Sequence, residues 1–349
     1  MNTVDLCPVG ALTSKDFRFK MRVWFLKETK TIDVDCGTGT NITLWTREDK
    51  VYRITPRQND AVNSCWMPDS HRLNYKYINA ETRIPQPVIR TDAEAPHRPS
   101  TWEPALASAA EAVKRIAPNQ LAIIASGRMT NEELYMVRHL AAQIGTDMVD
   151  IVPRMGESDG MLISADRNPN TNGARLVLDI EPGSKLDAIR EGVRSGSIKG
   201  ILSLGEDLIS PEAGFTAEDL DKLDYLFMTA HSANETARHA DLVLPGVTYA
   251  EKFGTMINVT GRIQRLNRAI QPIGYARDDW QIFRDITLLL GGNPALKDFN
   301  SALDILTAMS TEYGALNGVS WGSIGDGGQP ILETGVTIPV VEREKNQGR

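Results

Sequence analysis

The sequence is poor in cysteine and contains no long apolar run. Three cysteines, Cys7, Cys36 and Cys65, occur among 349 residues. So small and odd a number excludes a disulfide framework and favours a reducing compartment. No apolar stretch approaches the roughly 20 residues of a membrane-spanning helix, and the first residues lack the pattern of a secretory signal. These absences predict a cytoplasmic chain without a membrane span.

Basic residues are also in the minority. The formal net charge is −7 at pH 7, and an acidic chain is poorly suited to bind nucleic-acid phosphates as its principal partner. Hydrophobic residues make up 41% and charged residues 24% of the sequence, which is typical of a folded globular protein. The length suffices for two domains of about 100–200 residues each.

The first hundred residues differ in pattern from the rest. Residues 31–57 are rich in β-formers, and 42–45 and 51–54 flank a polar turn, which predicts a hairpin. Prolines then interrupt a polar stretch between Arg83 and Pro104, which predicts a linker.

Helix and strand signals alternate after this stretch. Thr130 and Glu133 form a capping box that opens a helix, and Gly145 ends it. We expect strands at 121–124, 149–152, 200–204, 225–228 and 242–244, and helices at 102–117, 185–194, 279–290 and 301–313. This alternation favours parallel β-α-β units with ligand sites at the carboxyl ends of the strands. Residues 314–349 are expected to form a loop.

Cys7 lies in the phrase Asp5-Leu6-Cys7-Pro8-Val9-Gly10-Ala11-Leu12-Thr13. A cysteine followed by proline is typical of the last thiolate of a tetranuclear iron–sulfur cluster. The proline fixes the turn, and the small residues let the backbone pass close to a cluster. The alternative for an isolated Cys-Pro is an unconnected thiol near the end of the chain.

The same phrase, followed by residues 19–24, closely resembles the large iron–sulfur subunit of respiratory complex I. This subunit is known as the 75-kDa subunit in mitochondria and has a direct counterpart in the bacterial NADH–quinone oxidoreductase. Residues 41–42, 51–57, 66–69 and Arg72 are similar to the next segment of that family. A later set is similar to a signature shared with molybdopterin enzymes: 235–237, 240–245, Glu251, 254–255, Asn258 and 261–264. These stretches cover most of residues 5–290.

The resemblance implies a fold and a division into domains. The fold is α/β, with a molybdopterin-oxidoreductase-type (formate dehydrogenase-like) parallel-sheet domain and a small β-rich N-terminal region. The implied domains are the tail of a ferredoxin-like cluster region (1–30), a β-rich degenerate 4Fe–4S-type domain (31–90), the α/β domain (100–313) and a tail (314–349).

The resemblance also implies a function. The chain would be a subunit, or the C-terminal part of a subunit, of the peripheral arm of NADH–quinone oxidoreductase. It would scaffold electron transfer from NADH through iron–sulfur clusters to quinone, bound to the other peripheral-arm subunits on the inner face of the cell membrane. The chain alone is not expected to be catalytic, because no nicotinamide, flavin or quinone site is identified in it.

The resemblance makes Cys7 a ligand of one shared 4Fe–4S cluster. The other three ligands are missing here, so a partner or a preceding segment must supply them. Residues 17–24 alternate bulky apolar and basic side chains, and we expect them to lie as a strand along an acidic neighbour. The alternative is a disordered terminus that retains the phrase without a cluster.

A second cluster, which molybdopterin enzymes hold near the N-terminus, is not expected. Asp33 and Thr40 stand at two of its thiolate positions, and Pro68 stands at the distant position, with Cys65 offset by three residues. One matching thiolate of four cannot hold a cubane. Cys36 and Cys65 are therefore predicted to be small, buried, structural residues.

Molybdopterin is not expected either. The stretch that resembles the metal-ligand loop, residues 145–157, ends in Gly156-Glu157 without a thiolate, and Asp159 is expected to be solvated. Residues 205–207 and 254–258 follow expected strands and are interpreted as turns and not as phosphate contacts. His231 and His239 are too sparse for a metal site, and His239 is expected at the surface or at a helix cap.

Two alternatives remain. One is a molybdenum- or tungsten-pterin oxidoreductase subunit of the formate dehydrogenase type, which metal analysis would reveal. The other is a module of a soluble NAD-reducing hydrogenase, whose small subunit shares the Cys-Pro phrase. The long region beyond Arg90 argues against that module.

Overall fold

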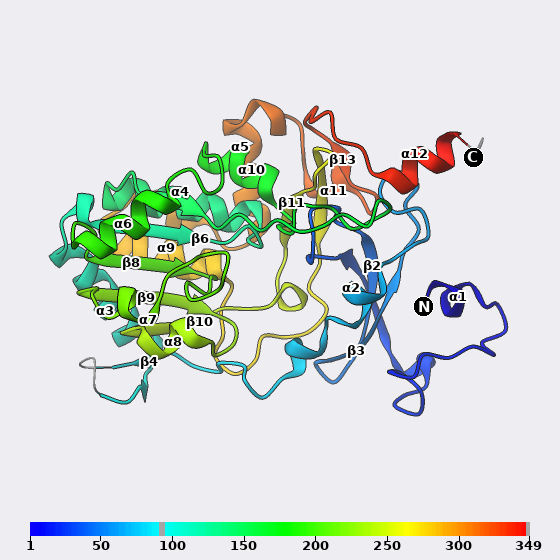
Figure 1. Ribbon diagram of the computed structural model, residues 1–349, viewed down its shortest axis with the longest axis horizontal. Coiled ribbons are helices and arrows are strands. Elements are labelled where there is room, and N and C mark those ends of the chain that lie inside the picture. The colour runs from blue at the N-terminus through cyan, green and yellow to red at the C-terminus, as the bar shows by residue number, and fades with distance from the viewer. Residues whose placement is uncertain (91–94, 347–349) are drawn as a thin grey trace.

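The computed structural model describes residues 1–90 and 95–346, which contain one seven-stranded and two three-stranded sheets. Figure 1 shows the large sheet at the left and the first residues of the chain at the right-hand edge. The strands are β1 (Lys27–Ile32), β2 (Asn41–Arg47), β3 (Lys50–Pro56), β4 (Val88–Ile89), β5 (Arg98–Pro99), β6 (Leu121–Ala125), β7 (Val149–Ile151), β8 (Gly200–Leu204), β9 (Tyr225–Ala230), β10 (Leu242–Pro245), β11 (Gly254–Ile257), β12 (Arg262–Leu266) and β13 (Gln329–Pro330).

Helices connect and cover these strands. The α-helices are α1 (Asn2–Leu6), α2 (Asp69–Leu73), α3 (Trp102–Arg115), α4 (Asn131–Ile144), α5 (Thr171–Leu178), α6 (Leu186–Ser195), α7 (Ala217–Leu220), α8 (Glu235–His239), α9 (Asp279–Leu289), α10 (Ala302–Glu312), α11 (Trp321–Ile324) and α12 (Pro339–Asn346). Short 3-10 turns are η1 (Val23–Phe25), η2 (Lys76–Asn79), η3 (Pro118–Gln120), η4 (Tyr249–Glu251), η5 (Pro294–Asp298) and η6 (Gly314–Leu316).

The large sheet has the order β5-β4-β10-β9-β8-β6-β7. The pairs from β10 to β7 are all parallel, which confirms the predicted β-α-β units. The chain passes from β6 to β7 on one side and to β8 on the other. Crossovers in opposite directions open a crevice at the carboxyl ends of the strands, where α/β sheets bind ligands.

Apolar side chains bury both faces of this sheet. Ile123 of β6 points into the core formed with α3, α4, α9 and α10. Its neighbours Ala122 and Ile124 point into the opposite core, which contains α6. Successive side chains of a strand alternate between faces, so an unbroken apolar run is required where helices cover both.

Helix α4 forms as its sequence predicts. The Thr130 hydroxyl accepts the N–H of Glu133, the Glu133 carboxylate accepts the N–H of Thr130, and Gly145 ends the helix in the left-handed conformation. These local contacts satisfy backbone groups that a helix end leaves without partners.

The two small sheets share one core. Ile42 and Leu44 of β2 pack in the same cluster as Met256 of β11 and Leu266 of β12. The predicted hairpin of β2 and β3 is confirmed. The β11–β12 hairpin, which the sequence pattern did not predict, brings residues 254–266 onto the N-terminal region.

Three sequence-based expectations need correction. The stretch predicted as a linker contains β4 and β5, which extend the large sheet as an antiparallel edge. The stretch 314–349, expected as loop, contains α11, β13 and α12, and Val340 and Val341 are buried. The strand expected at 17–24 is not formed. Turns at residues 15–20 and the 3-10 helix η1 occupy this segment instead.

Within the described residues, no helix combines the length and the apolar character needed to cross a membrane.

Candidate functional site

Cys7 follows helix α1 directly and begins a tight turn. Its backbone is extended (φ −71°, ψ 107°), and Gly10 occupies the left-handed region at φ 65°. The turn directs the backbone N–H groups of Leu12, Val9, Ala11 and Gly10 at the Cys7 sulfur, and they hold the pKa of its thiol below the ordinary value. Amides that stabilise the thiolate also favour metal ligation, because the thiolate is the form that binds metal.

Arg72 of α2 holds this turn in place. Its buried guanidinium contacts the Asp5 carboxylate at 2.5 Å and donates to the Asn2 side chain at 2.9 Å. The amino group of Met1 lies 2.5 Å from Asp69. None of the residues of α1 is buried. Ion pairs and hydrogen bonds, and not apolar packing, therefore attach α1 to α2.

The segment around Cys7 exposes an unusual amount of apolar surface. Among the described residues, seven of the sixteen exposed large apolar side chains lie between residues 6 and 25. Phe19 is 98% exposed and Val9 is 80% exposed. Arg22 lies over the ring of Trp24 at 5.2 Å, so basic and aromatic groups alternate on this face. Exposed apolar side chains gathered in one segment favour an interaction site.

The other cysteines are in different surroundings. Cys36 is fully buried, as predicted, and burial raises the pKa of its thiol to about 11. Its sulfur lies 4.0 Å from the carbonyl oxygen of Leu162. Cys65 is partly exposed, so the prediction that it is buried is wrong. Cys36 is an inert packing residue and does not have the environment of a thiolate ligand.

The residue at one expected thiolate position, Asp33, pairs with a histidine. Its Oδ2 lies 2.6 Å from Nδ1 of His71, and both side chains are buried. Burial lowers the pKa of His71, but the charge and hydrogen bond of Asp33 outweigh it, so the pKa is raised. Burial and the charge of Asp33 raise the pKa of the neighbouring Asp35 to about 7.

Residues of the molybdopterin-like signature hold the loop around Cys36. Asn258 donates to the carbonyl of Thr38 at 3.0 Å, and Gln264 donates to that of Gly39 at 2.9 Å. The amide of Val259 donates to the carbonyl of Gly37 at 2.8 Å. These side chains therefore have a structural role here.

A cavity of about 310 Å³ lies at the carboxyl edge of the large sheet. Ser126, Gly205, His231 and Gly246, the residues that directly follow β6, β8, β9 and β10, line it. Asp35 reaches it from the N-terminal region. The volume is at the lower end of the range for small-molecule sites, and its lining includes no cysteine.

His231 remains neutral in this cavity. Burial and the charges of Arg83, Lys252 and Arg128 lower its pKa to about 4. Its ring lies 5.4 Å from that of Tyr77, and its Nδ1 lies 2.8 Å from the Ser232 hydroxyl. His231 is therefore a packed aromatic residue within the wall of the cavity.

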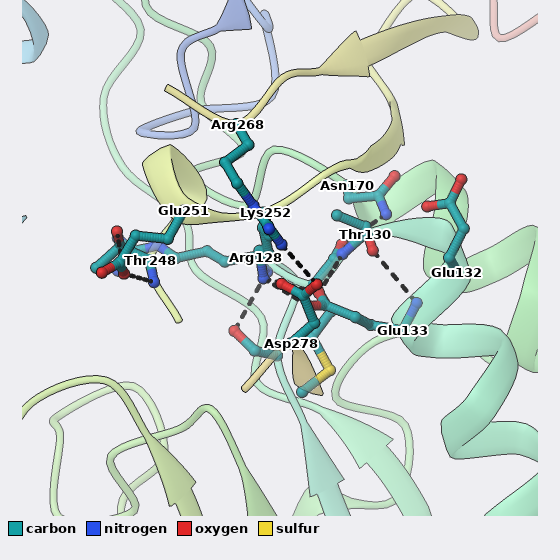
Figure 2. A network of polar contacts seen from close by, with 12 residues as sticks. Arg128, Thr130, Glu132, Glu133, Asn170, Thr248, Glu251, Lys252, Arg268 and Asp278 are labelled. Carbon is teal, nitrogen blue, oxygen red and sulfur yellow. Dashed lines mark hydrogen bonds and ion pairs between the residues drawn. The ribbon is translucent and has the colours of Figure 1, made fainter. Parts of the chain in front are cut away.

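Figure 2 shows a network of polar contacts around Glu133, and Lys252 of this network also lines the cavity. Lys252 donates to both oxygens of Glu133 at 2.8 Å. Glu132 accepts the amide and hydroxyl of Thr255 at 2.8 Å, and burial raises its pKa to about 7. Sequence reasoning missed the Lys252–Glu133 pair, since the two residues are 119 positions apart.

The remaining sequence-predicted positions show turn and cap chemistry. One Asp159 carboxylate oxygen accepts the amides of Met161, Leu162 and Ile163, each at 2.8 Å. This exposed side chain caps a turn, and its exposure agrees with the expectation that it is solvated. His239 ends α8 and lies 2.7 Å from Asp221. Gly205 forms a left-handed turn, whereas residues 254–257 form β11 itself and do not follow a strand.

Two family models match parts of the chain. Residues 152–287 match "Molybdopterin oxidoreductase", and residues 26–76 match "NADH-ubiquinone oxidoreductase NDSU1/NuoG-like, 4Fe-4S domain". The second match supports iron–sulfur chemistry for this region. The matched residues contain two cysteines, Cys36 and Cys65, which do not complete a four-thiolate cubane.

Acetylene hydratase from Pelobacter acetylenicus shares the fold. Its TM-score is 0.62 at 9% identity, and the match covers 84% of this chain and 73% of that one. Together with the family-model match to residues 152–287, this likeness confirms the expected molybdopterin-oxidoreductase-type α/β fold. At this identity it carries no information about the reaction.

Curated relatives are complex I subunits. The 78 kDa subunit of mitochondrial NADH-ubiquinone oxidoreductase is 27% identical in Candida albicans over 86% of this chain and 26% identical in Neurospora crassa over 83%. The corresponding NADH-quinone oxidoreductase subunit from Rickettsia conorii is 24% identical over 82%. This chain spans 55–59% of the length of these relatives. The predicted resemblance is confirmed: over most of its length the chain is similar to the 78 kDa subunit of NADH–ubiquinone oxidoreductases and to its bacterial counterpart.

Proposed function

We propose that this chain works in the peripheral arm of an NADH–quinone oxidoreductase. Its role there is to scaffold electron transfer from NADH through iron–sulfur clusters to quinone. The similarity to complex I subunits over more than four-fifths of the chain supports this function. Its partners are the other peripheral-arm subunits, and its place is the cytoplasmic face of the membrane. The chain contributes to an enzyme and is not itself the catalyst.

The geometry of the Cys7 turn carries this proposal. Cys7 gives one thiolate to a 4Fe–4S cluster, and another polypeptide or a segment preceding Met1 supplies the other three. The backbone amides that lower the pKa of the Cys7 thiol support this role, because they would also hydrogen-bond a ligated sulfur and tune the cluster's potential. Cys36 is unsuited to complete the set, because it is buried with a raised pKa.

The surface around Cys7 is where the cluster-bearing partner docks. Val9, Phe19 and Trp24 are exposed there, and the basic residues Arg18, Lys20 and Arg22 lie among them. An acidic partner with an apolar centre complements this surface, because interfaces combine a desolvated apolar core with complementary charge at the rim.

The test is Cys7→Ser in the assembled complex, with Cys65→Ser as the matched control. Cys65 is also partly exposed, so both changes replace an accessible thiol by a hydroxyl. We expect Cys7→Ser to abolish or shift one reduced-cluster EPR signal and to slow NADH-driven quinone reduction, while Cys65→Ser leaves both unchanged. An unaltered EPR spectrum in Cys7→Ser would remove Cys7 as a ligand.

The molybdenum- or tungsten-pterin oxidoreductase remains the second candidate, because the cavity lies at the edge where this fold binds ligands. The residues present do not fit the metal. The cavity lining provides no thiolate, and Asp159, one of whose carboxylate oxygens accepts three amides, is not part of that lining. Metal analysis of the purified chain discriminates: we expect neither metal, and stoichiometric molybdenum or tungsten would favour this candidate.

A further inference from the structure

Three potential metal-ligating side chains meet next to the buried Cys36 loop. Asp33 and Asp35 follow β1, and His71 lies in α2. One carboxylate oxygen of each aspartate and one ring nitrogen of the histidine lie within 4.8 Å of one another. A cation at the centre of such a set would reach all three after small side-chain rotations, since ligand distances to zinc are about 2.0–2.2 Å.

Two carboxylates meet here around a single imidazole. Asp33 is 2% exposed and forms an ion pair with His71. Asp35 accepts a hydrogen bond from Asn74 at 2.8 Å. Among the described residues, neither carboxylate makes an ion pair with lysine or arginine. Buried charges in proteins are normally paired or bound to metal, so this pair of aspartates favours a cation.

An independent observation comes from Thr40. Its Oγ1 is buried and has no hydrogen-bond partner among the described residues, and the residue itself is 0% exposed. The amide of Asp33 donates to the carbonyl of Thr40 at 2.8 Å, which continues the β1–β2 register beyond Ile32 and Asn41. Residues directly opposite in a ladder place their side chains on the same face, so this unsatisfied hydroxyl lies on the side of Asp33.

We propose that Asp33, Asp35 and His71 bind one divalent transition-metal ion, with the Thr40 hydroxyl beside it. Carboxylate oxygens together with an imidazole nitrogen form the donor set that Zn²⁺, Mn²⁺ and Fe²⁺ accept. The ion replaces the proton between His71 and Asp33, so binding releases that proton to solvent. Because Asp35 lines the 310 Å³ cavity, a fourth ligand position, for water, faces the cavity.

The test uses the full chain in a Cys7→Ser, Cys65→Ser background, which removes the two partly exposed thiols as competing ligands. Metal-free protein is titrated with Zn²⁺ by calorimetry, and Co²⁺ is added separately to record its visible absorption. We expect one saturable Zn²⁺ per chain and a Co²⁺ spectrum of low-symmetry N/O coordination. Absence of saturable binding would overturn the proposal.

Two variants locate the site, and a third is the matched control. Asp35→Asn is nearly isosteric at a partly exposed position, and with His71→Gln it should weaken Zn²⁺ binding at least about tenfold and abolish the Co²⁺ bands. Asp221→Asn removes the carboxylate of the more exposed Asp221–His239 pair and should change neither. Circular dichroism verifies that each variant is folded. Unchanged binding in folded Asp35→Asn, or loss of binding in Asp221→Asn, would contradict the proposed site.

Discussion

The Cys7 turn and the Cys36 loop differ in what each retains of a cluster-binding segment. The Cys7 turn keeps a reactive sulfur ringed by amides, but its surroundings are exposed and apolar. The Cys36 loop keeps its packing, with Asn258 and Gln264 holding its carbonyls, while its sulfur is buried and protonated. A loop that offers no cluster-binding thiolate can therefore still stabilise the fold. The Cys36 loop does so because it joins the β-rich region to the sheet domain.

The largest expected difference is in thiol reactivity. At pH 8 a thiol with a pKa of about 11 is roughly 0.1% thiolate, whereas backbone hydrogen bonds hold the pKa of the Cys7 thiol below its ordinary value, so a far larger fraction of Cys7 is ionised. Iodoacetamide should therefore modify Cys7 at least about 100-fold faster than Cys36 in the native isolated chain, with burial of Cys36 increasing the ratio.

Peptide mass spectrometry of timed samples measures both rates. The alkylation rate of Cys7 should titrate with an apparent pKa below the ordinary value of 9.0. In denaturant the two rates should converge, which is the internal control. Equal rates in the native protein would mean that the two turns do not differ as described.

The second prediction concerns the Cys36 loop. Asn258→Ala removes a buried side chain that donates to Thr38 and accepts the amides of Thr260 and Arg262. We expect the free energy of unfolding to fall by about 1–3 kcal/mol, because buried backbone groups lose their partners. Denaturant unfolding measures this, and Asn300→Ala, an exposed residue with a local hydrogen bond, should stay within about 0.5 kcal/mol.

The third prediction concerns the Cys7 turn alone. Arg72→Met breaks the contacts that Arg72 makes with Asp5 and Asn2 of α1, so amide exchange of residues 2–6 should accelerate about tenfold while the large sheet keeps its protection. Arg175→Met, which removes an exposed pair with Glu181, is the control and should leave α1 unchanged. Loss of protection across the sheet would show that α1 is coupled to the whole fold.

The smallest effects are expected when Cys36 or Cys65 is replaced by alanine. Cys36→Ala should cost about 1 kcal/mol for lost packing. Cys65→Ala, at a partly exposed position, should cost less. Thermal or denaturant unfolding ranks them, and the complex assembled with either variant should keep its electron transfer. If either variant folds normally but blocks electron transfer, the structural interpretation of that cysteine is wrong.

Local signals made much of the sheet domain predictable. Thr130, Glu133 and Gly145 define α4 because capping depends on residues three or four positions apart. The apolar run Leu121–Ala125 is buried on both faces, as its composition requires. The edge strands β4 and β5 escaped prediction because two-residue strands have no pattern of their own, and their pairing depends on β10.

The sequence by itself determined the parallel β-α-β order, the capped helices and the Cys-Pro turn, because each of these follows from neighbours along the chain. Only the tertiary structure decided which charges and amides meet. His71 reaches Asp33 across 38 positions, and Asn258 reaches Thr38 across 220. Such contacts form when distant elements dock to bury apolar surface, and no periodicity or motif within either segment encodes its partner.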